Sequence, residues 1–206
     1  MNKNLFRKCV TSFMFVLCAA NFAFAQAATL DEGKAGGIAT LYALDPLART
    51  YSFADGGREG GAFQENETRN RASDVDFNTY NEDSLTIGIE GGRIGTIIDL
   101  GSASELQKRY GYAETVGGGQ GFASLRAVNG KMVILKTYRP RLEQELAESA
   151  QFFAEPKSGA NAPVKLGHVY LVRITDRSDK AFERLVKLLV IAYTPKESVT
   201  IRWQIM

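Results

Sequence analysis

The chain has 206 residues, with 25 Lys and Arg against 23 Asp and Glu, a formal net charge of +2, and two cysteines, Cys9 and Cys18. Three of the positive charges and both cysteines lie in the first 25 residues, so the remainder is nearly neutral and has no thiol. This composition argues against nucleic acid or an anionic membrane as a partner. It also excludes disulfides and cysteine-based metal sites from residues 26–206.

The first 25 residues have the pattern of an export signal. Positive charges within residues 1–8 precede an apolar run, Cys9–Ala20, and the small residues that a signal peptidase requires end at Ala25. The run is too short to span a bilayer, which takes about 20 apolar residues. We therefore expect cleavage before Gln26, a secreted or periplasmic location, and no transmembrane span in the processed chain.

The processed chain is expected to hold one β-rich domain, 48–206, after an N-terminal segment, 26–47, that lacks a clear periodicity. Within that segment, residues 38–47 fit either a strand or a helical turn. Residues 49–54 have the alternation of a short strand. The glycine-rich residues 55–61 then predict a mobile surface loop.

Two alternating segments flank Gly91-Gly92, which predicts a hairpin with a two-residue glycine turn. In that register Leu85 faces Ile98, and the apolar partners fall on one side of the ladder. Gly88 then lies opposite Gly95 on the other side. The two glycines would leave a bare patch of backbone that a ring, a crossing strand or a ligand could approach closely.

The middle of the chain has one helix signal and one further hairpin signal. The Ser-x-x-Glu spacing at residues 102–105 is that of a capping box and predicts a short helix over 103–110. Asn129-Gly130 is a strong turn signal, and it predicts a second hairpin in which Leu125 faces Ile134.

The last part of the chain predicts one helix and three strands. From Pro140 to Phe153 the apolar residues recur at helical spacing, which predicts a helix. His168–Thr175 is apolar on both faces and is therefore expected to be a central strand. Leu185–Thr194 fits a helix by spacing, but its β-branched residues favour a strand. Ser198–Ile205 alternates apolar and polar residues, as a strand with one dry face does.

These elements predict an all-β fold, mainly antiparallel, in the form of a β-sandwich or a partly closed barrel with one or two short helices. His168 is the sole histidine, and no G-x-S-x-G motif presents a serine. The sequence therefore predicts no catalytic residue, and it predicts a partly exposed position for His168 at the start of a strand.

Two groups of residues are candidate sites. Gly117–Gly121 lacks the Lys-Ser/Thr ending of a nucleotide-binding loop, but it could form the rim of a ligand pocket with nearby rings and charges: Arg109, Tyr110, Tyr112, Gly118, Gly119, Gln120 and Phe122. Asp74, Asp76 and Asn78 resemble the start of a calcium loop without its glycine and closing glutamate. They are expected to be either a loose calcium site or a solvated strand face.

The sequence is most consistent with an exported, non-catalytic binding module that recognises a glycan, a small apolar ligand or a protein partner. Apart from calcium, no cofactor is expected. The alternatives are an extracellular hydrolase that uses carboxylates, with calcium assistance as one variant, and a structural component of an envelope assembly. The last of these would expose an apolar patch on its surface.

Overall fold

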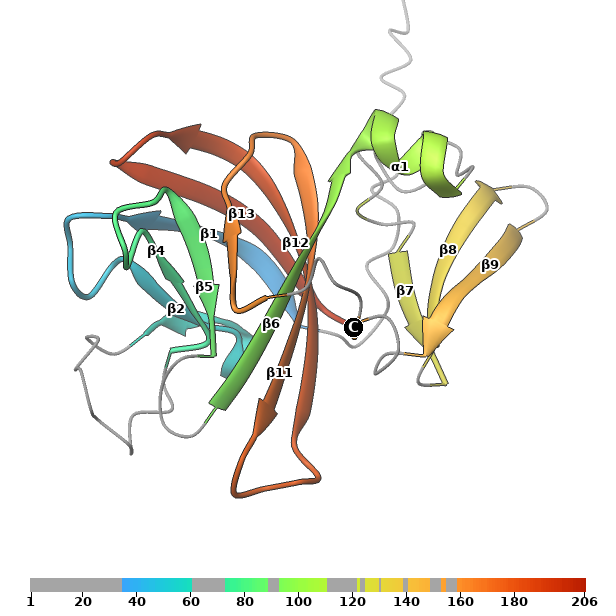
Figure 1. Cartoon of the computed structure of the whole chain (residues 1–206), viewed down its shortest axis with the longest axis horizontal. Helices are drawn as coiled ribbons and strands as arrows, with labels where there is room; N and C mark the ends of the chain where they lie inside the picture. Colours follow the sequence, from blue (N-terminus) through green and yellow to red (C-terminus); the bar gives the residue numbers. More distant parts are fainter. Residues whose placement is uncertain are drawn as a thin grey trace, which may run out of the picture.

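The structure is a computed structural model of the whole chain. It describes residues 35–60, 73–88, 93–110, 122, 125–129, 131–138, 141–148, 153–154 and 159–206. Over these residues the chain forms three antiparallel sheets, one 3-10 turn and one α-helix, and no sheet closes into a barrel (Figure 1). The predicted all-β, sandwich-like fold is confirmed.

The largest sheet forms the middle layer. Its strand order is β1-β13-β12-β11-β6, and the strands are β1 (Gly36–Tyr42), β6 (Arg93–Ser102), β11 (His168–Asp176), β12 (Glu183–Thr194) and β13 (Ser198–Ile205). The three C-terminal strands predicted from sequence are all confirmed, and β11 is central as expected. Residues 38–47, for which the sequence left two possibilities, hold the end of strand β1 and the turn that follows it.

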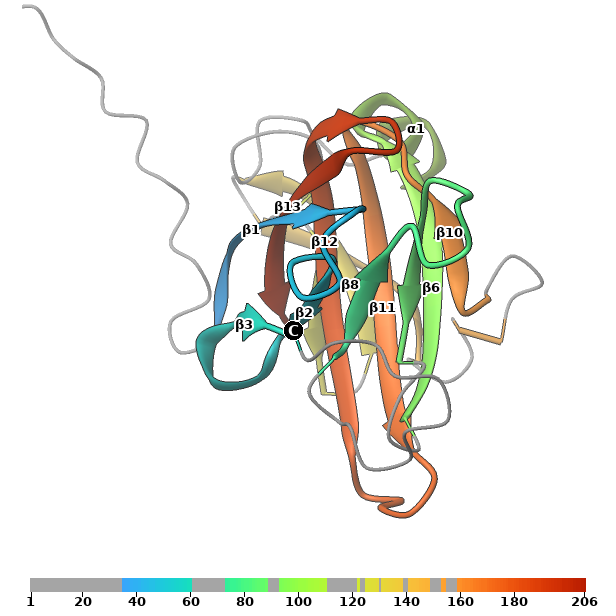
Figure 2. The same ribbon diagram turned by 90° about the vertical axis from the view of Figure 1, so that its left-hand side faces the viewer.

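A second sheet packs against one face of the middle layer (Figures 1 and 2). Its order is β10-β5-β4-β2-β3, with β2 (Thr50–Ser52), β3 (Arg58–Glu59), β4 (Val75–Phe77), β5 (Ser84–Ile87) and β10 (Asn161–Pro163). The core between the two sheets contains Trp203, Phe77, Phe53 and Tyr170, all at most 1% exposed.

A third, smaller sheet covers the opposite face of the middle layer. It is formed by β7 (Leu125–Val128), β8 (Lys131–Tyr138) and β9 (Arg141–Glu148), and α1 (Ala103–Tyr110) lies beside it (Figure 1). Leu125, Met132 and Leu106 from these elements pack against Val169 and Leu171 of β11. A strand in a middle layer must be apolar on both faces, which is the pattern that β11 shows in the sequence.

The predicted hairpin around Gly91-Gly92 is wrong in its pairing. Leu85 of β5 pairs with Phe77 and Ala162, whereas β6 pairs with β11 of the other sheet, so that Ile98 faces Leu171. The turn itself, residues 89–92, lies outside the described residues. The two glycines nevertheless meet: a Cβ added to Gly88 would lie 2.7 Å from the Gly95 nitrogen. The chain therefore crosses from one sheet to the other, and a crossing strand occupies the bare patch.

The helix predicted between Pro140 and Phe153 is also wrong. Residues 141–148 form β9, which pairs along its length with β8. Leu, Glu, Gln and Ala favour a helix in isolation, but pairing with a neighbouring strand outweighs that local preference. Among the described strands of this sheet, β9 lies at the edge.

Local capping and turn signals gave correct predictions elsewhere. The helix spans Ala103–Tyr110, as expected, and the Ser102 amide donates to Glu105 Oε2 at 2.6 Å. The second hairpin has the predicted register, with Leu125 opposite Ile134, and Asn129 in its turn has φ = 51°.

The described part of the predicted surface loop, residues 55–60, includes regular secondary structure. It contains the 3-10 turn Ala54–Gly56 and strand β3. A Cβ added to Gly57, where φ is +93°, would lie 2.1 Å from Tyr51 Oη and 2.3 Å from the Trp203 ring. Gly57 therefore allows the backbone to pack directly on the aromatic core.

Candidate functional site

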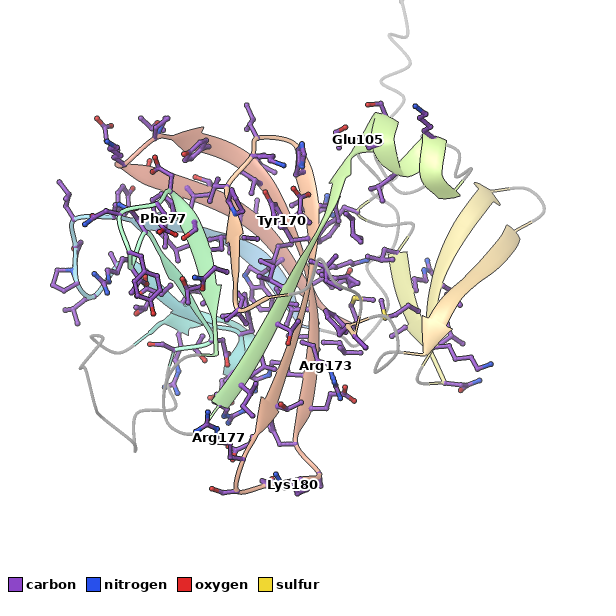
Figure 3. The ribbon with its side chains drawn as sticks, viewed as in Figure 1. Phe77, Glu105, Tyr170, Arg173, Arg177 and Lys180 are labelled. Carbon is purple, nitrogen blue, oxygen red and sulfur yellow. The ribbon has the colours of Figure 1, made fainter. Side chains whose placement is uncertain are left out.

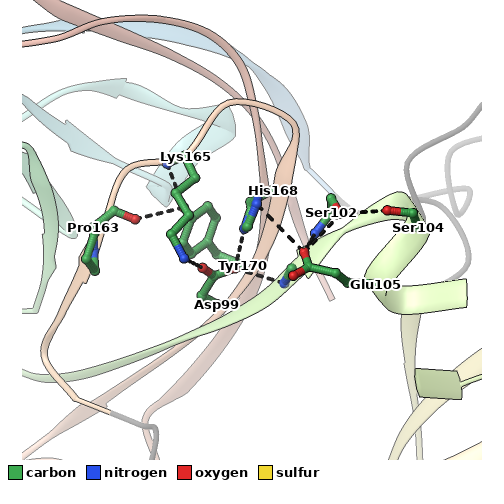
Figure 4. Close-up of polar contacts among 9 residues, drawn as sticks. Asp99, Ser102, Ser104, Glu105, Pro163, Lys165, His168 and Tyr170 are labelled. Carbon is green, nitrogen blue, oxygen red and sulfur yellow. Dashed lines mark hydrogen bonds and ion pairs between the residues drawn. The ribbon is translucent and has the colours of Figure 1, made fainter. Parts of the chain in front are cut away.

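A polar pocket lies where β6 meets α1, beside the start of β11 (Figure 4). Its volume, about 580 Å³, is in the range of small-molecule sites, roughly 300–1,000 Å³. The lining comes from β6, α1, β11 and the turn before β11: Asp99, Leu100, Gly101, Glu105, Lys108, Lys165 and His168. We call this the Asp99 pocket.

A β-bulge sets the direction of the Asp99 side chain. Tyr170 pairs with Asp99 and Val169 with Gly101, so that Leu100 is the extra residue on β6. A bulge bends its strand and redirects the side chains beside it. Gly101, at φ = +98°, leaves space for Glu105, whose Oε2 would lie 2.6 Å from an added Cβ. The bulge and the glycine together bring two carboxylates to one pocket.

Asp99 is the centre of a hydrogen-bond network (Figure 4). Its Oδ1 lies 2.8 Å from His168 Nδ1 and accepts from the Gly101 amide at 2.8 Å. Its Oδ2 accepts from Lys165 Nζ at 3.0 Å. Burial alone would raise the pKa of Asp99, but the hydrogen bonds from His168, Lys165 and Gly101 outweigh it, and the pKa lies below its usual value. Asp99 is therefore ionised at neutral pH.

The Asp99 carboxylate determines how His168 is oriented. A carboxylate only accepts hydrogen bonds, so the proton of a neutral imidazole lies on Nδ1 and leaves Nε2 as an acceptor. Nε2 is 3.8 Å from Glu105 Oε2, which is beyond hydrogen-bond distance. The side chain of His168 is 16% exposed, which agrees with the partly exposed strand-end position predicted from sequence.

Glu105 and Lys108 form the α1 side of the pocket. Glu105 Oε2 accepts from the Ser102 amide and, at 2.9 Å, from Ser102 Oγ. These bonds lower the pKa of Glu105. Lys108 follows three residues later, and positions i and i+3 share one face of a helix. The helix cap therefore also orients a pocket carboxylate.

Tyr170 fixes the turn that carries Lys165. Its side chain is fully buried, its Oη donates to the Pro163 carbonyl at 2.8 Å, and it accepts from the Lys165 amide at 2.9 Å. Burial raises the pKa of the phenol far above its usual value, so it stays protonated. Lys165 is thus presented by a turn that is anchored in the core.

The Asp99 network makes a pH-dependent contribution to stability. Because its pKa is lowered in the folded state, Asp99 stabilises the fold above its unfolded pKa of about 3.9, and that contribution is lost as the pH falls through the lower folded value. We expect Asp99→Asn to reduce the free energy of unfolding by about 1–2 kcal/mol at pH 7. The difference from the wild type should shrink below about pH 4. Urea titrations at several pH values measure this difference in stability. A difference that stays constant down to about pH 2 would contradict a lowered pKa of Asp99 in the folded protein.

Most of the ligand-binding residues predicted from sequence remain untested. Arg109 and Tyr110 end α1, and their side chains lie outside the described residues, as do Tyr112, Gly118, Gly119 and Gln120. Phe122 is described, and it is buried in the second core at 1% exposed. Lys187 and Arg202 lie over its ring, each 4.8 Å from the centroid. Phe122 therefore packs between sheets.

The predicted calcium residues are buried rather than a solvated strand face. Asp74, Asp76 and Asn78 are at most 7% exposed. Asp74 Oδ2 accepts from Arg184 at 2.6 Å, and Asp76 Oδ2 from Arg49 Nε at 3.1 Å.

Two further oxygens in this group also have internal partners. Asp76 Oδ1 accepts from Thr79 Oγ1, and Asn78 Oδ1 from the Asp83 amide. Within the described ranges no three His, Cys, Asp or Glu residues are grouped as a metal site would require.

Sequence reasoning considered His168 but missed its partners. Asp99 and Lys165 lie 69 and 3 residues from His168 along the chain, and no local motif links Asp99 to it. Glu105 was identified as a helix cap, and the bulge that directs Asp99 toward His168 has no sequence signature beyond Gly101.

No family model, curated protein or solved structure matches the chain. In the part of the chain that the structure describes, no helix is both long and apolar enough to cross a membrane.

Proposed function

We propose that this protein is an exported, non-catalytic binding module, and that the Asp99 pocket binds a neutral, hydroxyl-rich ligand such as the sugar units of a glycan. Export is supported by the signal pattern of residues 1–25. The observation that carries the binding proposal is the prearranged set of donors and acceptors around Asp99, because groups held in place before binding lose little freedom when a ligand arrives.

The charges of the pocket favour a neutral ligand. Two carboxylates, Asp99 and Glu105, oppose two ammonium groups, Lys108 and Lys165. The formal charges of these four groups cancel, so together they give an ion no net attraction. A hydroxyl group both donates and accepts, and can therefore pair with Glu105, with either lysine and with His168 Nε2. This polar lining supports a glycan more than a small apolar ligand.

The pKa directions disfavour a glycoside-hydrolase role for the Asp99 pocket. Such enzymes use one carboxylic acid that remains protonated near neutral pH because its pKa is raised. The pKa values of Asp99 and Glu105 are both lowered, so neither is suited to protonate a leaving group.

The positions of the nearby serines disfavour an acyl-transfer role. Ser102 lies opposite His168 in the sheet, but its Oγ donates to Glu105 and lies 3.1 Å from Ser104 Oγ. A relay would need a serine hydroxyl directed at the imidazole. The Asp99–His168 pair is better suited to hold a ligand than to activate a nucleophile.

The proposal predicts binding of neutral oligosaccharides. Titration calorimetry and thermal denaturation of the purified protein with neutral, acidic and basic oligosaccharides should detect binding in the neutral set. A bound ligand should raise Tm by about 5–10 °C when its free concentration is about 100 times Kd. Lys108→Ala should weaken binding by about tenfold, because it removes a charged hydrogen-bond donor from the pocket.

Lys180 provides the matched control. It is exposed in the β11–β12 turn, at the opposite end of the middle sheet from Glu105 (Figure 3), so Lys180→Ala should leave binding unchanged. Equal effects of the two lysine variants, or binding restricted to charged oligosaccharides, would contradict the proposal.

A further inference from the structure

Three turns form one end of the sandwich, and none of the residues that line the Asp99 pocket belongs to them. They are residues 43–49, 78–83 and 195–197, and Figure 2 faces them. The Ala43 amide donates to the Glu197 carbonyl at 2.8 Å, and the Lys196 amide donates to Asp83 Oδ1 at 2.6 Å. The turns are therefore tied into a continuous surface.

This end of the sandwich exposes large apolar side chains. Leu44 is 89% exposed, and Tyr42, Leu47 and Tyr80 are between 52% and 55% exposed. Tyr42 and Leu44 also line an open hollow of about 670 Å³. Burying one such side chain is worth about 1.5–3 kcal/mol, and grouped exposed apolar residues often mark an interaction site.

The exposed leucines are held outward by the turn itself. Asp45 Oδ1 accepts from the Leu47 amide at 2.9 Å and from the Ala48 amide at 3.1 Å. The Arg49 carbonyl accepts from the Phe77 amide at 2.9 Å, which joins the turn to β4. Because these bonds fix the backbone, little conformational freedom would be lost when a partner covers Leu44 and Leu47.

The same surface is acidic. The three turns carry four carboxylates, Asp45, Glu82, Asp83 and Glu197, against two cations, Arg49 and Lys196. Arg49 is paired with the buried Asp76, so its charge is compensated inside the fold. Asp45 and Glu197 lie on the apolar hollow itself. A partner would therefore match this surface best if it brought both apolar side chains and positive charge.

We propose that this turn-end surface, formed by Tyr42, Leu44, Asp45, Leu47, Tyr80 and Glu197, docks a cationic amphipathic segment of another protein. A second copy of this chain that docked through the same face would present the same excess of negative charge and would be repelled. An anionic membrane would be repelled in the same way. A helix with apolar residues on one face and Lys or Arg beside them satisfies both features of the surface.

Two synthetic peptides test the proposal. Each has about 18 residues with leucines along one helical face, and the polar positions are all Lys in one and all Glu in the other. Fluorescence anisotropy with the purified protein should show the Leu/Lys peptide binding at least about tenfold more tightly than the Leu/Glu peptide. Added salt should weaken the Leu/Lys complex.

Surface variants identify where the peptide binds. Leu44→Ser should weaken binding of the Leu/Lys peptide by about tenfold, with little effect on folding because Leu44 is 89% exposed. Glu197→Gln should weaken it less and reduce its salt dependence. Ile94→Ser is the matched control, since Ile94 is 45% exposed on β6 and should not affect binding.

Four results would overturn the proposal. The first is equal binding of the two peptides, and the second is equal loss of binding in Leu44→Ser and Ile94→Ser. The third is a dimer in sedimentation experiments that Leu44→Ser dissociates, since the occupant would then be a second copy. The fourth is Leu44-dependent binding to phosphatidylcholine or phosphatidylglycerol vesicles, which would identify a membrane instead.

Discussion

Gly95→Ala is expected to destabilise the protein by about 3 kcal/mol or more, because overpacking a filled site against backbone forces the surrounding strands apart. A Cβ at this position would lie 2.0 Å from the Ile87 carbonyl oxygen and 2.2 Å from the Ile87 carbonyl carbon. Both atoms belong to the backbone of β5 and cannot rotate away. Urea unfolding followed by the fluorescence of Trp203, which is buried between the same two sheets, measures the change.

Gly159→Ala is the matched control for Gly95→Ala. Gly159 forms a β-bridge with Ile97, which lies on β6 as Gly95 does, but a Cβ added to Gly159 would meet nothing closer than 3.7 Å. Its effect should stay within about 0.5 kcal/mol. If Gly95→Ala is as mild as Gly159→Ala, β5 does not cross β6 at this point and the junction between the two sheets is misplaced.

Arg184→Met is expected to cost about 3–5 kcal/mol, because it leaves the buried Asp74 carboxylate without its charged partner. Arg184 lies 2.6 Å from Asp74 Oδ2, and Asp74 is 1% exposed. The remaining partners of that oxygen, Ser52 Oγ and the Phe53 amide, are neutral. Methionine keeps an apolar stem of similar length, so the loss reflects the charge.

Arg173→Met tests the same chemistry on the surface. Arg173 pairs with Glu183, and the two side chains are 30% and 40% exposed. Exposed pairs contribute about 0–1 kcal/mol, so this variant should change the urea midpoint little. Equal losses for Arg173→Met and Arg184→Met would mean that Asp74 is solvated in the folded protein.

Features set by neighbouring residues could be predicted from the sequence. The alternation in Ser198–Ile205, the Asn129-Gly130 turn and the cap of α1 depend on contacts a few residues apart, and all three are present in the structure. The two-sided apolar pattern of β11 also indicated a central strand, although not that a third sheet would cover its other face.

Features set by distant segments could not be predicted in this way. Gly91-Gly92 favours a tight turn, but whether the flanking strands pair depends on competition from β11 for β6 and from β4 and β10 for β5. The helical spacing of residues 140–153 likewise yields to pairing with β8. The Asp99 pocket could not be predicted for the same reason, since Asp99 and His168 are in contact but lie 69 positions apart in the sequence.

Nuclear magnetic resonance of the His168 imidazole gives the most direct reading of whether the Asp99 pocket binds a ligand. His168 is the sole histidine of the chain, so an untagged protein labelled with ¹⁵N has one set of ring signals. Titration with a neutral oligosaccharide that binds should shift the Nε2 and Hε1 signals in a saturable manner, with the Kd found by calorimetry. If the oligosaccharide binds while these signals stay unchanged, the ligand site lies elsewhere on the molecule.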